Sequence, residues 1–373
     1  HFTAYGVPEG GHNAGMAHVG VRELLTELSY PFEMAVKAGA LSLMTAYNEV
    51  DGIPCTANPF LTNQLLRDQW GFAGFVVSDL YSIDGLISQR VAASREEAGI
   101  LALRSGVDSD LGGNCFSTDL VKACREGRLA EADIDRAVSR ILRLKFKMGL
   151  FDNPYVKVKK AEKLIGTPGH REVAREVARQ SVVLLKNENQ LLPLSKEVKR
   201  VAVIGPNADN VYNQLGDYTA PQAPGSVITV LEGIRQKLPG AEVCYVKGCA
   251  VRDTLDTSIG EACETAKNSD VVVVVLGGSS ARDFETDFLE TGAAVANERK
   301  ESDMESGEGF DRIGLSLMGK QVELLKTLYA TGKPVVLVMI QGRPLELNWA
   351  AEHIPAILTA WYPGGEGGRA IAD

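Results

Sequence analysis

At positions 71–85 the chain runs G-F-A-G-F-V-V-S-D-L-Y-S-I-D-G. The apolar, partly β-branched run Phe75–Val77 predicts a short buried strand. The run ends at Ser78-Asp79, so a carboxylate is expected where a parallel strand meets its loop. Catalytic groups of (β/α) barrels gather at that end of the strands. The alternative is that Asp79 caps the helix that follows, and position alone leaves both interpretations open.

Strands alternate with helices on both sides of this segment, which favours a parallel sheet or barrel. The expected strands are at residues 40–47, 75–79 and 107–111, and the expected helices at residues 21–39, 58–70, 95–105 and 117–147. Asn58 is the expected N-cap of its helix, with Pro59 in the first turn. These strand–helix units are too few for a complete (β/α)₈ barrel, which has eight. The sequence therefore predicts the C-terminal part of such a barrel.

A second α/β domain is predicted in the rest of the chain. Helices are expected at residues 170–185, 226–238, 258–268 and 319–331, and strands at residues 201–204, 242–246, 270–276, 334–340 and 356–361. This pattern favours a parallel sheet with helices on both faces. We expect a partial barrel domain at residues 1–155, a linker at residues 156–169 and an α/β/α sandwich domain at residues 170–373.

Composition disfavours several classes of function. The net charge of −9 disfavours a surface for nucleic acid or an anionic membrane. No apolar run reaches the roughly 18 residues that a membrane span requires. The six cysteines lack C-x-x-C spacing and the five histidines lack an H-E-x-x-H pattern. We therefore expect no metal site and no disulfide framework.

Several ordered motifs together resemble glycoside hydrolase family 3, which includes β-glucosidases and β-xylosidases. The motifs are M-T-A-Y-N-E-V-D-G-I-P at 44–54, G-F-V-V-S-D at 74–79, G-V-D-S-D at 106–110, S-V-V-L-L-K-N at 181–187, V-A-V-I-G-P at 201–206, G-E-G-F-D-R at 307–312 and W-Y-P-G-G-E-G-G at 361–368. The resemblance covers nearly the whole chain. It implies a retaining, exo-acting β-glycosidase that hydrolyses terminal β-D-glucosyl or β-D-xylosyl residues of oligosaccharides without a cofactor. It also leads us to expect a chain truncated at both ends, whose barrel is completed by a missing segment or in a homo-oligomer.

Glycoside hydrolysis requires two carboxyl groups. The resemblance assigns the nucleophile to Asp79 and the general acid/base to Glu308. Glu308 is flanked by glycines in the long connection 278–319, and loops of that length are uncommon unless they serve a function. Glu305 is the nearby alternative, and an acidic, solvated loop without catalytic role is the other interpretation.

Further residues follow from the same resemblance. His1 and Tyr47 correspond to residues that contact the sugar, although a terminal histidine and a core tyrosine are ordinary alternatives. The family lysine that precedes the histidine has no counterpart here, and Leu80 stands where many members have a tryptophan that stacks on the substrate. Ion pairs that fix the long loop are expected at Arg282-Asp283 and Asp311-Arg312. Two further carboxylates, Asp108 and Asp110, are expected at a strand end, where capping alone would explain them.

Two other functions compete with this interpretation. A nucleotide-binding protein is suggested by the strand and glycine turn at 201–205, but no G-x-G-x-x-G or G-x-x-x-x-G-K-[ST] motif follows. A shift of the melting temperature with NAD or ATP would test it. The other competitor is a catalytically impaired or fragmentary carbohydrate-binding member of family 3. Activity on nitrophenyl glycosides would separate that protein from an enzyme.

Overall fold

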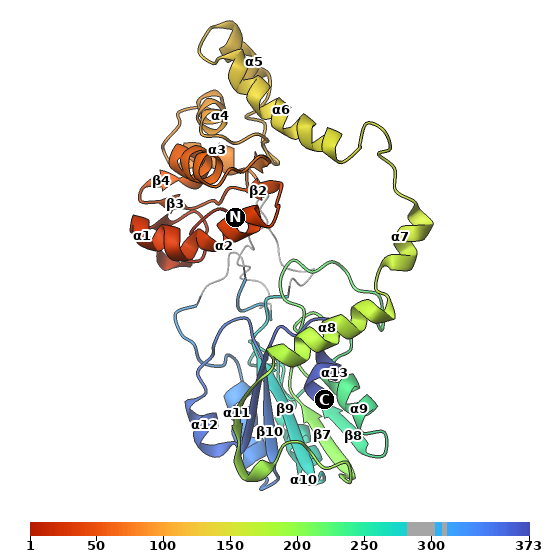
Figure 1. The fold of residues 1–373 in the computed structure, drawn as a ribbon. Coiled ribbons are helices and arrows are strands. Elements are labelled where there is room, and N and C mark those ends of the chain that lie inside the picture. The colour runs from red at the N-terminus through yellow and green to blue at the C-terminus, as the bar shows by residue number, and fades with distance from the viewer. Residues whose placement is uncertain (282–302, 308–311) are drawn as a thin grey trace. The chain divides into compact units, whose positions relative to one another are not determined.

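A computed structural model describes residues 1–281, 303–307 and 312–373 of the chain. The chain forms two compact units, His1–Lys157 and Val158–Asp373, and each is described here by itself (Figure 1). Both units mix strands and helices, so the predicted α/β fold class is confirmed. In the part of the chain that the structure describes, no helix has the length and apolar character needed to cross a membrane.

The first unit contains short strands between helices. Its strands are β1 (Met16–Ala17), β2 (Ser42–Met44), β3 (Glu49–Val50), β4 (Ile53–Pro54) and β5 (Phe75–Val77). Its helices are η1 (Glu9–Gly11), α1 (Val21–Glu23), η2 (Leu24–Leu28), α2 (Tyr30–Lys37), η3 (Cys55–Ala57), η4 (Phe60–Gln69), α3 (Ser82–Ser88), α4 (Arg95–Arg104), α5 (Thr118–Arg125) and α6 (Glu131–Lys147). As predicted, the side chain of Asn58 caps η4, because its Oδ1 accepts from the backbone N–H groups of Phe60 and Leu61.

A parallel arc of strands organises this unit. Phe2 forms a parallel bridge to Thr45, just beyond β2. Strand β2 pairs in parallel with β5, and Val77 at the end of β5 bridges Ser109. Parallel strands that follow one another in chain order with helices between them are the building pattern of a (β/α) barrel.

The predicted strand at residues 107–111 is reduced to that single bridge. Gly106 has a φ of 100°, which is not an extended strand conformation. The carboxylate of Asp108 accepts the backbone N–H of Val76 at 2.8 Å, so a side chain takes the place of a main-chain ladder bond. The ladder therefore cannot extend along β5.

The predicted continuous helix at residues 117–147 is also wrong, because α5 and α6 are separate. Gly127, with a φ of 73°, follows the end of α5. The N–H of Arg128 donates to the carbonyl of Ala123, and the N–H of Gly127 donates to that of Cys124. This pair of bonds is the Schellman motif, which terminates a helix at a glycine.

The second unit is a three-layer α/β/α arrangement around a six-stranded sheet. Its strands are β6 (Val183–Asn187), β7 (Arg200–Ile204), β8 (Glu242–Val246), β9 (Val271–Gly277), β10 (Val335–Ile340) and β11 (Ala356–Trp361), in the spatial order β6-β11-β10-β9-β7-β8. Its helices are α7 (Val158–Leu164), α8 (Pro168–Ser181), η5 (Glu188–Gln190), α9 (Val230–Lys237), α10 (Ile259–Lys267), α11 (Gln321–Tyr329), α12 (Asn348–His353) and α13 (Gly367–Ala372). The segment predicted as a linker thus contains α7.

Strand β9 shows how the sheet is buried. Alternate valines, such as Val272 and Val274, pack with α10, α11 and α12, whereas Val271 and Val273 pack with α9 and α13 on the other face. Figure 1 shows these helices on the two sides of the sheet. A strand buried on both faces appears in the sequence as the continuous apolar run seen at 271–276.

One strand breaks the predicted all-parallel order. The helix expected at residues 170–185 ends at Ser181, and β6 pairs antiparallel with β11 at the sheet edge. Val182 already has extended backbone angles, and two β-branched residues, Val182 and Val183, stand at the transition. β-branched side chains favour strands over helices, which explains why the helix ends earlier than its periodicity suggested.

Candidate active site

Asp79 directly follows β5, as the sequence predicts. The residue is only 6% exposed. Its Oδ1 accepts the N–H of Leu80 at 2.8 Å. Its Oδ2 is buried, lies 3.1 Å from Nε2 of His1, and accepts no hydrogen bond of regular geometry from the described residues. Among the described residues, the carboxylate accepts a hydrogen bond only from the N–H of Leu80, before α3 begins, so helix capping does not explain this carboxylate.

Both predicted sugar-contacting residues, His1 and Tyr47, lie beside Asp79. The ring of His1 stacks on Tyr5 with 4.8 Å between centroids, and Tyr5 lies 6.3 Å from the ring of Tyr47. The hydroxyl of Tyr47 donates to the carbonyl of Leu80 at 2.6 Å. His1, Tyr47 and Asp79 therefore belong to one cluster. Tyr5, which the sequence gave no reason to select, connects two of them.

Backbone and side-chain bonds hold the loop after β5. The hydroxyl of Ser78 donates to the carbonyl of Asp79 and accepts the N–H of Leu111, both at 2.9 Å. The carbonyl of Leu111 accepts the N–H of Tyr81, whose φ is 58°. A left-handed conformation at a tyrosine is uncommon and persists only where its surroundings impose it. These bonds fix the direction in which the chain leaves Asp79.

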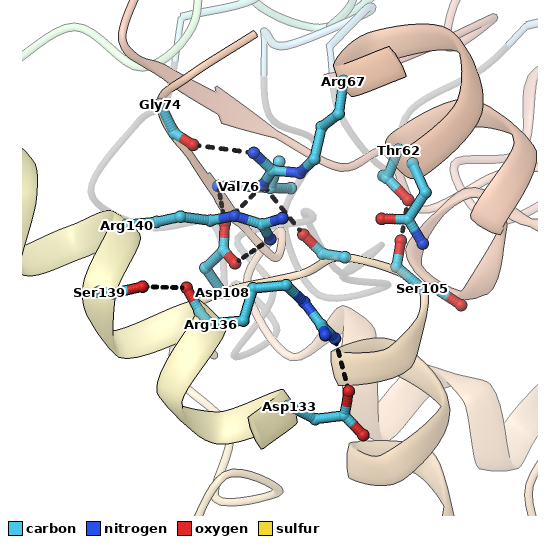
Figure 2. Close-up of polar contacts among 12 residues, drawn as sticks. Thr62, Arg67, Gly74, Val76, Ser105, Asp108, Asp133, Arg136, Ser139 and Arg140 are labelled. Carbon is cyan, nitrogen blue, oxygen red and sulfur yellow. Dashed lines mark hydrogen bonds and ion pairs between the residues drawn. The ribbon is translucent and has the colours of Figure 1, made fainter. Parts of the chain in front are cut away.

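A buried cluster of charged side chains around Asp108 also supports β5. Figure 2 shows Arg67 and Arg140 converging on the carboxylate of Asp108. Arg67 donates to its Oδ2 at 2.7 Å and Arg140 to its Oδ1 at 2.8 Å, while the N–H of Val76 also donates to Oδ2. Burial lowers the pKa of Arg67 to about 10, and the negative charge of Asp108 opposes that shift. The role of Asp108 is thus to join η4, β5 and α6, which goes beyond the capping expected from sequence.

One group of side chains has the ligand types and spacing of a possible metal site. Asp84, Asp110 and Cys115 are the one set of His, Cys, Asp and Glu residues in the described ranges whose potential ligand atoms lie close together. Asp84 is held by Arg95 and by the thiol of Cys115, and Asp110 accepts the N–H of Cys115 at 2.8 Å. Burial, followed by the hydrogen bond to Asp84, raises the pKa of the Cys115 thiol to about 12. These groups engage both oxygens of Asp84 and Oδ2 of Asp110. Only Oδ1 of Asp110 is buried without a hydrogen-bond partner among the described residues, and we assign the cluster no metal.

Of the two glutamates considered for the acid/base role, the structure describes Glu305. Glu308 lies outside the described residues, and so do Arg282, Asp283 and Asp311. Glu305, the alternative candidate, is 3% exposed. Its Oε2 lies 2.6 Å from Nη1 of Arg312. Arg312 therefore pairs with Glu305, a partner that the sequence did not suggest, and the expected pair of Arg312 with Asp311 stays a prediction.

Doubly wound folds bind nucleotides at the carboxyl ends of two neighbouring strands from which the chain departs in opposite directions. In the second unit these strands are β7 and β9, and side chains fill this position. Asn207, which is fully buried, donates to the carbonyls of Gly278 and Ile340 and accepts from Asn213. Ser279 donates to Asn213 in turn. This network argues against the nucleotide-binding alternative.

Family models match both units. The glycosyl hydrolase family 3 N-terminal domain matches residues 1–144, and the C-terminal domain of the same family matches residues 182–373. The chain belongs to glycosyl hydrolase family 3. The family resemblance expected from the sequence is therefore confirmed.

The relatives of this family 3 chain carry two kinds of name, beta-xylosidase and beta-glucosidase. A beta-xylosidase of Formosa agariphila is 38% identical over the whole chain, which covers 50% of that protein. A periplasmic beta-glucosidase of Salmonella typhimurium is 34% identical, and the chain covers 49% of it. Among solved structures, a β-glucosidase from Erythrobacter marinus matches with a TM-score of 0.87 at 38% identity, and the whole chain covers 50% of it. The chain spans about half the length of the curated relatives it matches.

Proposed function

We propose that this family 3 protein is a retaining, exo-acting β-glycosidase that removes terminal β-D-glucosyl or β-D-xylosyl residues from oligosaccharides. The observation that carries the proposal is the state of Asp79. It combines a position at the end of a parallel strand, a buried carboxylate and one oxygen that the described residues leave without a regular hydrogen bond. A nucleophile needs such an oxygen directed at its substrate.

The two oxygens of Asp79 suggest different roles. Oδ1 is engaged by the N–H of Leu80, so Oδ2 is the atom we assign to attack on the anomeric carbon. Glu308 protonates the departing glycosidic oxygen in the first step. In the second step it takes a proton from water, which then displaces the sugar from Asp79. The result is net retention of configuration after two inversions.

The neighbours of Asp79 are suited to holding the sugar. Nε2 of His1 lies 3.1 Å from the attacking oxygen, so a hydroxyl next to the anomeric carbon is within its reach. The hydroxyl of Tyr47 already donates to Leu80, and its oxygen retains lone pairs that can accept from a sugar hydroxyl. Leu80 offers an aliphatic contact on the leaving-group side, without the stacking surface of an indole.

The names of the relatives support glucosides and xylosides as the substrates to test. The first experiment is a panel of nitrophenyl β-glucoside, β-xyloside and α-arabinoside with the intact chain. Hydrolysis of a β-glucoside or β-xyloside supports the proposal. No hydrolysis of any of them, together with binding of the free sugars, would favour the impaired carbohydrate-binding alternative.

The stereochemical outcome tests the mechanism. Proton NMR of the first minutes of hydrolysis should show the β-anomer of the released sugar before mutarotation supplies the α-anomer. An α-anomer formed first would contradict the glycosyl-aspartate at Asp79, since inversion requires a single displacement by water.

A further inference from the structure

The described residues on both sides of segment 308–311 are anchored to the second unit. Oδ1 of Asp303 accepts the N–H groups of Val251 and Arg252 at 3.0 and 3.3 Å. Arg252 in turn donates to the carbonyl of Met304 at 2.9 Å. The backbone N–H groups of Glu305 and Ser306 both donate to the carbonyl of Ser279, two residues after β9. The stem before the segment is therefore part of the folded unit.

Arg312 holds the stem on the other side. Its Nε donates to the carbonyl of Gly314 at 2.6 Å, and its Nη2 donates to the carbonyl of Ser316. Its Nη1 lies 2.6 Å from Oε2 of Glu305. One guanidinium therefore joins both ends of the segment between them.

The ion pair between Glu305 and Arg312 is buried. The Glu305 side chain is 1% exposed and the Arg312 side chain 10% exposed. A guanidinium only donates hydrogen bonds, so Oε2 of Glu305 must act as the acceptor and is not available to give a proton. Breaking a buried pair by removing one partner leaves an uncompensated charge and is costly. Oε1 of Glu305 is buried and has no hydrogen-bond partner among the described residues, so it is through Oε2 that Glu305 holds Arg312.

We propose that Glu305 and Arg312 are a positioning pair that fixes where the acid/base segment leaves the second unit. This inference rests on the proposed function, in which Glu308 lies between them in sequence. It predicts that loss of the pair displaces the proton donor while the nucleophile, in the other unit, is untouched. Displacement of a reacting group by about 1 Å can cost about 100-fold in rate.

The test uses Glu305→Gln, Arg312→Met and the double variant of the intact chain. On a β-linked disaccharide each single variant should lose about 10- to 100-fold in kcat/KM. On the dinitrophenyl glycoside of the same sugar, whose leaving group needs no proton, the loss should stay below about threefold. The double variant should be no slower than the worse single variant, because both changes remove the same interaction. Asp256→Asn, in the exposed pair with Lys247, is the matched control and should leave both rates unchanged.

Three results would overturn the inference. Equal losses on both substrates would show a merely structural role. Unchanged rates would show no role. Restoration of Glu305→Gln turnover by azide, without the same effect in Arg312→Met, would make Glu305 the acid/base itself.

Hydrogen exchange separates this inference from the proposed function. If the unaltered chain hydrolyses no glycoside, the proposed function fails, and exchange of the Glu305 and Ser306 amides then decides the role of the pair. Faster exchange of these amides in both single variants, and not in Asp256→Asn, supports the positioning role. Unchanged exchange overturns it, because the pair then does not hold the stem.

Discussion

At the scale of single residues, Asp79 carries the proposed chemistry. Asp79→Asn should lower turnover by about 10³-fold or more, because an amide cannot form the glycosyl ester. The amide is nearly isosteric and can still accept the N–H of Leu80, so folding should be retained. The measurements are kcat on the best substrate of the panel and a thermal melt of the same sample. Undiminished turnover would remove Asp79 from the mechanism.

The sequence indicated Asp79, His1 and Tyr47, because each lies at a recognisable strand end or within a family motif. It did not indicate Tyr5, because stacking on His1 depends on a chain path that no local pattern encodes. The sequence favoured Glu308 over Glu305 through the family motif and the flanking glycines. It did not indicate the contact between Glu305 and Arg312, because no local pattern encodes that ion pair.

At the scale of elements, the cluster around Asp108 holds β5 between two helices. Asp108→Asn should lower the free energy of unfolding by about 3 kcal/mol, because two largely buried guanidinium groups would lose their shared negative partner. Urea unfolding followed by circular dichroism would measure this change. Asp256→Asn is the matched control, and its effect should stay within about 0.5 kcal/mol because its ion pair is exposed. Equal effects of the two substitutions would contradict the bracing role.

Local patterns predicted most elements of the second unit well, because strands such as β9 are long, apolar and buried. They failed at residues 107–111, where a carboxylate replaces a ladder bond. That replacement depends on Arg67 and Arg140, which lie 41 and 32 residues away in the chain. They also failed at Gly127 and at Val182, where single residues ended a helix earlier than the apolar periodicity suggested.

At the scale of the whole molecule, the hydrophobic cores of the two units are separate. Each cluster of buried side chains in the described ranges lies wholly before residue 157 or wholly after it. The intact chain should therefore unfold in two calorimetric transitions, since two-state behaviour is a property of single cores. Asp108→Asn should lower the midpoint of one transition. Gly277→Ala should lower the other, because Gly277 has a φ of 135° and an added Cβ would lie 1.9 Å from the carbonyl oxygen of Ile340. If either substitution shifts both transitions equally, or if a single transition is observed, the units unfold together and the separate cores do not define independent folding units.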